Sequence, residues 1–435
     1  MAQVSVSHMQ VTFPFRLPDT ITLFVGSICA FLLAYLLTFG VIALCHRLGW
    51  LDRPATRRIH KQAVPRLGGI AMFLAFVIAS LPFYTPGSSK ETVIYWLLLV
   101  SALTIVLVHA YDDVKGLKPL PKFIAQTIAV IIILGPFGTQ FHGVLLFGIS
   151  NPFGRAIAST HQPWYLKPEL TLFIHQPEIS FAAIPAVLFT WFWIVGMMNT
   201  VNWIDGMDGL ATGLVAITGV FITITSWVLG QHSIAILTAI FTGAVCGFLP
   251  HNWNPARIFM GDSGSQFLGL GLAVLSTMGG AKVGAALMLL GIPILDVAVV
   301  AINRIRSGQR PWHFDMTHLH HRLLATGLSV RQICYLFYAM TIFFGLLALF
   351  LTRFYKLIGI GLVGVTMAAL IIWLDYLQRR RGVPIRLGGP DNEPPNGLVT
   401  AEDNTTVEYK RATPSQYEEQ QKMVSTGGLP PLTST

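Results

Sequence analysis

The stretch FAAIPAVLFTWFWIVGMMNTVNWIDGMDGLATGLVAITGVFITITSWVL, residues 181–229, contains two long apolar runs separated by a short polar loop. Each run approaches the roughly 20 residues that an α-helix needs to cross a bilayer. The loop between the runs carries four polar side chains, those of Asn199, Asn202, Asp205 and Asp208. We therefore expect two transmembrane helices whose connection gathers acid and amide groups at one membrane surface.

The same pattern extends over most of the chain. Only 11% of its 435 residues are charged and its mean hydropathy is +0.61, whereas soluble domains have about 25% charged residues. The sequence predicts an all-α polytopic integral membrane protein with about eleven transmembrane helices. Several expected spans are short, which leaves room for a re-entrant segment. The expected spans are Ile21–Cys45, Ile70–Phe83, Val93–Tyr111, Phe123–Phe137, Phe181–Met198, Leu210–Leu229, Ser233–Pro250, Ser265–Met278, Val283–Ile302, Ile333–Leu351 and Leu357–Leu377.

The basic residues predict the orientation. If the N-terminus lies outside, the inner loops and the start of the tail hold nineteen Lys and Arg residues, against seven in the outer segments. Because cytoplasmic loops carry the excess of positive charge, we expect the N-terminus out and the C-terminus in. Five aspartates then share the cytoplasmic face: Asp112, Asp113, Asp205, Asp208 and Asp262. Carboxylates near hydrocarbon are costly, so this grouping indicates cation binding or proton handling.

Composition divides the chain into three parts. Residues 1–20 form an N-terminal segment, residues 21–380 a membrane domain, and residues 381–435 a tail rich in Pro, Gly, Ser, Thr, Asn and Glu that we expect to be disordered. The outer stretch 138–180 carries four prolines and scattered aromatic residues, which suits an irregular or interfacial segment. The basic inner rim would attract anionic lipids and nucleotides, and nothing in the sequence resembles a nucleic-acid-binding module.

Two inner loops contain basic residues. In the first loop they lie beside two glycines, and in the second beside two aspartates. RRIHKQAVPRLGG, residues 57–69, supplies cationic side chains, including Lys61, and two glycines that would let the backbone approach an anionic ligand, although positive-inside topology also explains the charge. In YDDVKGLKPLPKF, residues 111–123, the adjacent Asp112 and Asp113 would repel each other unless they share a cation or a proton. A solvated helix end with local salt bridges is the alternative.

Two further inner loops offer oxygen ligands. In NTVNWIDGMDGL, residues 199–210, the two asparagines and the two aspartates are each three apart, so each pair can share one face and offer the hard oxygens that Mg²⁺ prefers. In HNWNPARIFMGDSGSQFLG, residues 251–269, Asp262 stands at an expected helix start. Backbone amides there could meet phosphate while the carboxylate holds a metal, although a helix N-cap is the alternative.

The last candidates surround the ninth expected span. Asp296 lies within that span, where an acid either serves function or bonds a neighbouring helix, and the sequence leaves both open. Downstream, NRIRSGQRPWHFDMTHLHHRL, residues 303–323, brings together His318, His320, His321 and Arg322. Neither a suitable cysteine nor an H-E-x-x-H arrangement accompanies these histidines, so phosphate binding fits them better than zinc.

The order of these motifs resembles the polyprenyl-phosphate N-acetylhexosamine-1-phosphate transferases, glycosyltransferase family 4. The resemblance covers roughly residues 40–325: HK..VPRLGG, DD..K, N..N..DG.DGL, FMGD.GS and D..HLHHRL. The closing HLHHRL resembles the branch that acts on UDP-GlcNAc and undecaprenyl phosphate. The phospho-MurNAc-pentapeptide branch typically has consecutive histidines there, and Leu319 interrupts such a run here.

The resemblance implies transfer of a sugar 1-phosphate from a UDP-sugar to undecaprenyl phosphate, with release of UMP. The catalytic residues it implies are Asp112, Asp113 and Asp262. Those implied to bind Mg²⁺, with Mn²⁺ as a substitute, are Asn202 and Asp262. The implied nucleotide-sugar contacts are Asn199, Asp205, Asp208 and Asn252; the phosphate or sugar contacts are His318, His320, His321 and Arg322; the lipid-phosphate contacts are Lys61 and Lys122. Direct attack by the lipid and prior phosphorylation of an aspartate both remain open.

The resemblance also implies the setting and the partners. We expect a bacterial cytoplasmic (inner) membrane enzyme with its active site on the cytoplasmic face, which uses a UDP-sugar and a polyprenyl phosphate and forms a homodimer. UDP-MurNAc-pentapeptide or another UDP-N-acetylhexosamine is the alternative donor. A cation-coupled transporter is a more distant alternative, because the acids crowd the inner rim instead of lining a path across the bilayer.

Overall fold

The computed structural model describes residues 17–52, 63–137, 140–141, 143–144, 146, 174–175, 178–179, 183–278, 282–308, 317–351 and 353–381. In these ranges the chain forms thirteen α-helices and three antiparallel hairpins of two-residue strands. The helices are α1 (Asp19–Leu48), α2 (Gly68–Phe83), α3 (Ser89–Lys115), α4 (Pro119–Leu134), α5 (Ala183–Ile204), α6 (Leu210–Val228), α7 (His232–Asn252), α8 (Gly261–Thr277), α9 (Val283–Leu289), α10 (Gly291–Arg306), α11 (Leu319–Ala325), α12 (Val330–Phe350) and α13 (Arg353–Arg381). The strands are β1 (Leu51–Asp52), β2 (Val64–Pro65), β3 (Pro136–Phe137), β4 (Gln140–Phe141), β5 (Ile174–His175) and β6 (Glu178–Ile179).

Local signals explain where several helices begin. The Ser88 hydroxyl accepts a hydrogen bond from the Glu91 amide at the start of α3, and Ser329 and Gln332 form a capping box at the start of α12. Pro119 is the first residue of α4, a position that has no intrahelical N–H bond to lose. Polar residues at the ends of apolar segments therefore set these boundaries.

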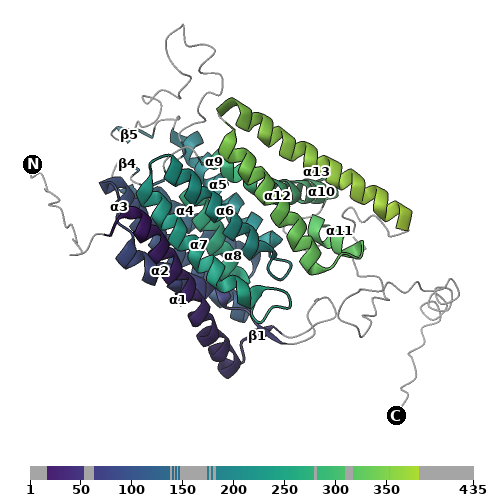
Figure 1. Cartoon of the computed structure of the whole chain (residues 1–435), viewed down its shortest axis with the longest axis horizontal. Coiled ribbons are helices and arrows are strands. Elements are labelled where there is room, and N and C mark those ends of the chain that lie inside the picture. The colour runs from purple at the N-terminus through teal and green to yellow at the C-terminus, as the bar shows by residue number, and fades with distance from the viewer. Residues whose placement is uncertain are drawn as a thin grey trace, which may run out of the picture.

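The helices form one bundle with α8 at its centre. Helix α1 packs on α2 and α7 at one edge, and α13 lies at the opposite edge beside α9, α10 and α12 (Figure 1). Helix α8 contacts α3, α5 and α2, and every one of its residues is buried except Asp262. The central helix thus presents one partly exposed carboxylate at its N-terminal end.

The outer surface of the bundle is apolar. Large hydrophobic side chains are exposed along the edge helices, among them Phe24, Leu36, Val365 and Ile372 on α1 and α13. Such a surface suits contact with lipid chains, since water would not favour so much exposed apolar area. The chain is therefore a helical polytopic membrane protein, as the sequence predicted.

Within the described ranges, seven helices are long and apolar enough to cross a membrane. The predicted span Val283–Ile302 is not a continuous helix, because α9 and α10 meet at Leu290 and are bent by 74°. Counted as one broken span, this pair brings the number to eight. The helices α2 and α4, predicted as spans, have only 16 residues each. The predicted segment 1–20 and tail 381–435 lie almost wholly outside the described residues.

Loop contacts place several helix ends at the same end of the bundle. The Phe259 amide donates to Pro65 O, which joins the segment before α8 to the segment before α2. The Arg331 guanidinium, at the start of α12, donates to Asn254 O, just after α7. The acidic motifs therefore meet at one end of the bundle, as their assignment to one membrane side requires.

Candidate active site

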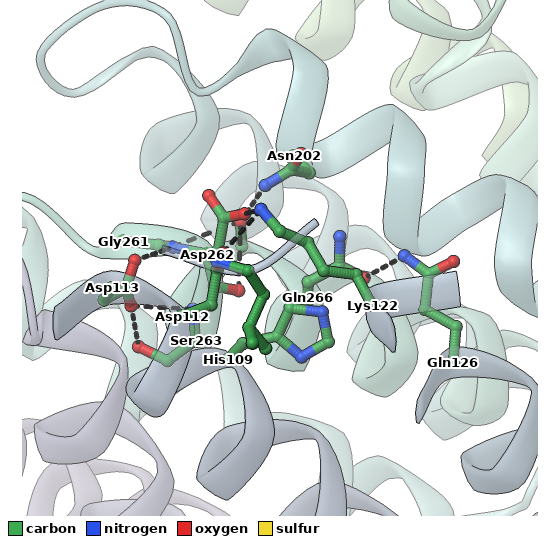
Figure 2. Close-up of polar contacts among 12 residues, drawn as sticks. His109, Asp112, Asp113, Lys122, Gln126, Asn202, Gly261, Asp262, Ser263 and Gln266 are labelled. Atoms are coloured by element: carbon green, nitrogen blue, oxygen red, sulfur yellow. Dashed lines mark hydrogen bonds and ion pairs between the residues drawn. The ribbon is translucent and has the colours of Figure 1, made fainter. Parts of the chain in front are cut away.

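The N-terminus of α8 is anchored by an aspartate from α3. Asp113 Oδ1 accepts a hydrogen bond from the Asp262 amide at 2.8 Å, and Asp113 Oδ2 accepts from the Ser263 amide at 3.1 Å and the Ser263 hydroxyl at 2.8 Å (Figure 2). A carboxylate at this position also suits the helix dipole. The prediction that these amides meet phosphate is therefore wrong, since Asp113 already occupies them. The catalytic role expected for Asp113 remains a prediction; its observed contacts hold α8 in place.

Close backbone packing explains the glycines of the RLGG and MGD motifs. A Cβ at Gly69 would lie 2.2 Å from the Gly264 amide nitrogen, so α2 and α8 approach each other here through bare backbone. Gly261 has φ +70° and lies against Arg66 O, where a side chain would be strained as well as blocked. The expectation that Gly69 brings backbone close to a ligand is wrong: its close neighbour is α8.

A lysine bridges two of the predicted catalytic acids. Lys122 Nζ, on α4, lies 2.5 Å from Asp112 Oδ2 and 2.8 Å from Asp262 Oδ2, so α3, α4 and α8 converge on one ammonium group (Figure 2). The second carboxylate oxygen of Asp112 accepts the Leu117 amide at 2.6 Å. Lys122 was predicted to bind the lipid phosphate. In this structure it neutralises two carboxylates, and phosphate would have to share or displace those contacts.

A buried amide network lies one helical turn deeper. The Gln126 side-chain amide donates to Gln266 Oε1 at 3.0 Å and exchanges hydrogen bonds with the Asn199 side chain. Asn202 donates to the Ser265 hydroxyl at 2.8 Å. Gln126 and Gln266 were missed by the motif reading. Each follows a site residue by four positions, Lys122 and Asp262 respectively, and that helical spacing in an apolar span was the available signal.

His109 is a second residue that the motif reading missed. It is fully buried on α3 beside the Asp112 and Lys122 cluster (Figure 2). Its Nδ1 donates to Ile105 O at 2.9 Å, and its Nε2 has no hydrogen-bond partner within the described part of the chain. A histidine three residues before Asp112 in an apolar segment was the available signal.

The loop between α5 and α6 is tied to the loop after α7. Asp208 Oδ2 accepts from the Asn254 side chain and from the Ala256 amide, both at 3.0 Å. The buried Asn252 carboxamide bonds the Gly209 amide, the Thr212 hydroxyl and Ile258 O. Both residues were predicted to contact the nucleotide sugar. In this structure their polar atoms hold the two loops together, and the nucleotide-sugar contact stays a prediction.

Asp205 is the other acid of this loop. Burial raises the pKa of its carboxyl well above the ordinary value, and the neighbouring Asp262 carboxylate raises it further. Arg66 acts in the opposite direction. An incoming cation would favour the ionised form of Asp205 by offsetting this repulsion.

The histidine motif covers the same loop. His318 Nδ1 donates to Asp296 Oδ2 at 2.9 Å, and the His318 ring meets the edge of Trp203 with centroids 6.0 Å apart. His320 and His321 lie against Gly206. Burial holds the pKa of His320 well below its usual value, with the two neighbouring histidines adding to the effect.

Arg322 points elsewhere. Its guanidinium bonds the carboxylate of Asp375 and the side-chain oxygen of Gln378, both on α13. The prediction that Arg322 contacts phosphate or sugar is thus not supported by its position, which joins α11 to α13. The predicted anion-binding Lys61 lies outside the described residues, as do Arg57, Arg58 and Asp315.

The donor groups at the junction suit a magnesium ion shared with a substrate. The described residues contain no group of three or more His, Cys, Asp or Glu side chains arranged to hold a metal by themselves. Mg²⁺ usually takes only one or two protein carboxylates and completes its shell with water and phosphate oxygens. Asp262, the one residue of α8 that is not buried, and Asn202 beside Ser265 offer such a set.

Comparisons with known proteins agree on the family to which this chain is similar. The profile described as glycosyl transferase family 4 matches residues 95–280. A probable undecaprenyl-phosphate N-acetylglucosaminyl 1-phosphate transferase of Bacillus subtilis is 31% identical over 76% of this chain and 85% of its own length. A decaprenyl-phosphate N-acetylglucosaminephosphotransferase of Mycobacterium tuberculosis is 32% identical over 71% and 77%. A phospho-N-acetylmuramoyl-pentapeptide-transferase of Staphylococcus aureus is 33% identical over 67% and 86%.

Proposed function

The chain belongs to glycosyl transferase family 4, and from that premise we propose that it transfers GlcNAc 1-phosphate from UDP-GlcNAc to undecaprenyl phosphate. An oxygen of the lipid phosphate forms a bond to the sugar-bearing phosphorus, and the bond from that phosphorus to UMP breaks. The products are undecaprenyl-diphospho-GlcNAc and UMP. The names of the Bacillus and Mycobacterium relatives support this donor and this class of acceptor.

The observation that carries the proposal is the convergence of Asp112, Lys122 and Asp262 at one end of a lipid-facing bundle. Transfer between two anions requires charge neutralisation and alignment more than an unusual nucleophile. Lys122 supplies positive charge at the meeting point of three helices. Asp112 is the candidate that deprotonates or positions the lipid phosphate.

We propose Mg²⁺ as the cofactor, with Mn²⁺ as a substitute, held by Asp262 and Asn202. When bound, the ion would neutralise charge on the donor diphosphate. The neighbouring Asp113 holds the start of α8 so that the Asp262 carboxylate faces Lys122. Asp205 lies near the same carboxylates, and a bound cation would favour its ionised form.

We propose eleven membrane crossings with the N-terminus outside, the site on the cytoplasmic face of the bacterial inner membrane and the C-terminus inside. The broken pair α9 and α10 counts as one crossing, and α2, α4 and α8 as short ones. The ends of α3, α5 and α7 and the starts of α4, α6 and α8 all contribute to the site, which supports a strict alternation of direction. The excess of basic residues on the site side supports its cytoplasmic placement.

A donor panel tests the proposal. Purified protein is incubated with Mg²⁺, undecaprenyl phosphate and either UDP-GlcNAc, UDP-GalNAc or UDP-MurNAc-pentapeptide, and released UMP is measured. We expect UDP-GlcNAc to be used best. Preference for UDP-MurNAc-pentapeptide, the alternative donor suggested by the Staphylococcus relative, would overturn the assignment of UDP-GlcNAc as donor. Absence of UMP release with every donor would overturn the transferase assignment.

A further inference from the structure

One buried carboxylate outside the acidic cluster is fully engaged by the histidine motif. Asp296 lies on α10 with 4% of its surface exposed. Its Oδ2 accepts the hydrogen of His318 Nδ1 at 2.9 Å, and its Oδ1 accepts the Leu319 amide, also at 2.9 Å. One side chain therefore holds both the ring of His318 and the first amide of α11.

This pairing fixes the orientation of the His318 ring. When a partner occupies Nδ1, it determines the tautomer and the direction in which Nε2 points. The ring is confined further by Trp203 on one side and by stacking on His320, with centroids 5.7 Å apart. A side chain held at three places has little freedom left, so its second ring nitrogen keeps a defined direction.

A second contact joins α10 to α5. The Arg304 guanidinium, two turns after Asp296 on α10, lies 5.4 Å from the centre of the Trp203 ring on α5. Trp203 follows the predicted metal-binding Asn202 directly. Helix α10 therefore aligns the histidine motif with the α5 segment through two independent pairs, which a simple helix-to-helix hydrogen bond would not require.

From this geometry we propose that Asp296 is a positioning residue for sugar-phosphate transfer, acting through His318. It holds the ring so that Nε2 faces a nucleotide sugar bound over residues 199–210. The inference rests on the proposed function, because it assigns a task within the same site. The sequence left two uses open for Asp296, a functional role and a bond to a neighbouring helix. In this proposal the same contact serves both.

A double-mutant cycle tests this inference. The variants are Asp296→Asn, His318→Gln and the double substitution, each assayed for kcat and KM with UDP-GlcNAc. We expect Asp296→Asn to lower kcat roughly 10- to 100-fold, the usual effect of removing an orienting partner, with a smaller change in KM. The double variant should be no slower than His318→Gln alone, because Asp296 acts through that ring.

Asp19→Asn is the matched control. Asp19 and His232 form a similar pair, with Oδ2 and Nδ1 3.1 Å apart, on helix ends away from the acidic cluster. We expect this variant to keep wild-type turnover. Effects of Asp296→Asn and His318→Gln that simply multiply, or full activity of Asp296→Asn, would overturn the inference while wild-type turnover leaves the proposed function standing.

Two further measurements test the inference if the Asp296→Asn protein folds poorly or if the wild-type protein shows no turnover. Asp296→Glu keeps the charge but moves it by one methylene, and we expect it to fold and to lose kcat by about tenfold; unchanged kcat would contradict the inference. Hydrogen–deuterium exchange over residues 317–325 needs no turnover. Asp296→Glu should exchange faster there than wild type, and equal protection would contradict the role assigned to the Leu319 contact. Absence of wild-type turnover with every donor would instead overturn the proposed function, and this inference with it.

Discussion

Lys122 connects the two carboxylates on which the proposed chemistry depends. Asp112 and Asp262 come from different helices, and each lies within 2.8 Å of the same ammonium group. Without that positive charge the carboxylates would repel each other at the N-terminus of a buried helix. The lysine therefore stabilises the junction before any substrate arrives, and its charge is available when anionic substrates bind.

Lys122→Gln tests this double role. We expect turnover to fall about 100-fold or more, because a preorganised charge at the reacting phosphates is lost. We also expect a lower Tm, since two carboxylates remain without their partner. Adding Asp112→Asn should restore part of the Tm but not the turnover. A Lys122→Gln protein with wild-type kcat would contradict the role given to this residue.

Gly206 keeps the histidine motif close to the acidic loop. A methyl group at this position would lie 2.6 Å from His320 Nε2, and a rigid imidazole cannot move aside as a flexible chain could. We expect Gly206→Ala to reduce kcat/KM roughly 10- to 100-fold by displacing the ring. The measurement is the UMP-release assay, with thermal unfolding as the check on folding.

Gly196→Ala is the matched control for that substitution. Gly196 lies on α5 and an added methyl would meet nothing within 4 Å. This variant should keep its activity and its Tm. Equal losses in Gly196→Ala and Gly206→Ala would show that the effect comes from glycine replacement in general and not from the histidine contact.

Helix α8 is positioned by its close approach to α2. Gly69 and Gly264 bring the two backbones together, and the Gly69 amide donates to Met260 O at 2.9 Å just before α8 begins. Asp113 then fixes the first turn of α8 from α3. The carboxylate of Asp262 is thus placed by contacts that lie outside the reacting groups.

Gly69→Ala tests this packing. The new methyl group would overlap backbone that cannot rotate away, and overpacking of this kind typically costs about 1–3 kcal/mol. We expect a lower Tm in thermal unfolding and reduced turnover. Gly40→Ala on α1, where a methyl group meets nothing within 4 Å, should show neither change. A Gly69→Ala protein as stable as wild type would contradict the proposed helix contact.

Much of the arrangement of helices could be predicted from the sequence, because apolar runs and basic loops reveal spans and direction locally. The break between α9 and α10 was not predicted, although Gly291 and Pro293, just after Leu290, were a local signal for a break. The site motifs were found because polar residues stand out at span ends. Their partners were missed or misassigned where the contact is long-range: Asp113 with α8, Asn252 with Gly209, and Arg322 with Asp375.

The whole molecule is a bundle with an acidic junction at one end and an apolar outer surface. Its orientation in the membrane gives a prediction at this scale. In a background without the native cysteines, Lys90→Cys, exposed next to the start of α3, should react with a membrane-impermeant maleimide in intact cells. Lys118→Cys, exposed between α3 and α4, should react only after the membrane is permeabilised. The reverse labelling pattern would contradict the proposed topology. A homodimer stays a prediction.

The measurement that tests the account most directly is product formation from both substrates by wild-type protein and by Asp262→Ala. With UDP-GlcNAc, undecaprenyl phosphate and Mg²⁺, wild type should release one UMP for each undecaprenyl-diphospho-GlcNAc detected by mass spectrometry. A well-folded Asp262→Ala protein should form neither product. Absence of the lipid product with wild type, or undiminished turnover by Asp262→Ala, would contradict the account.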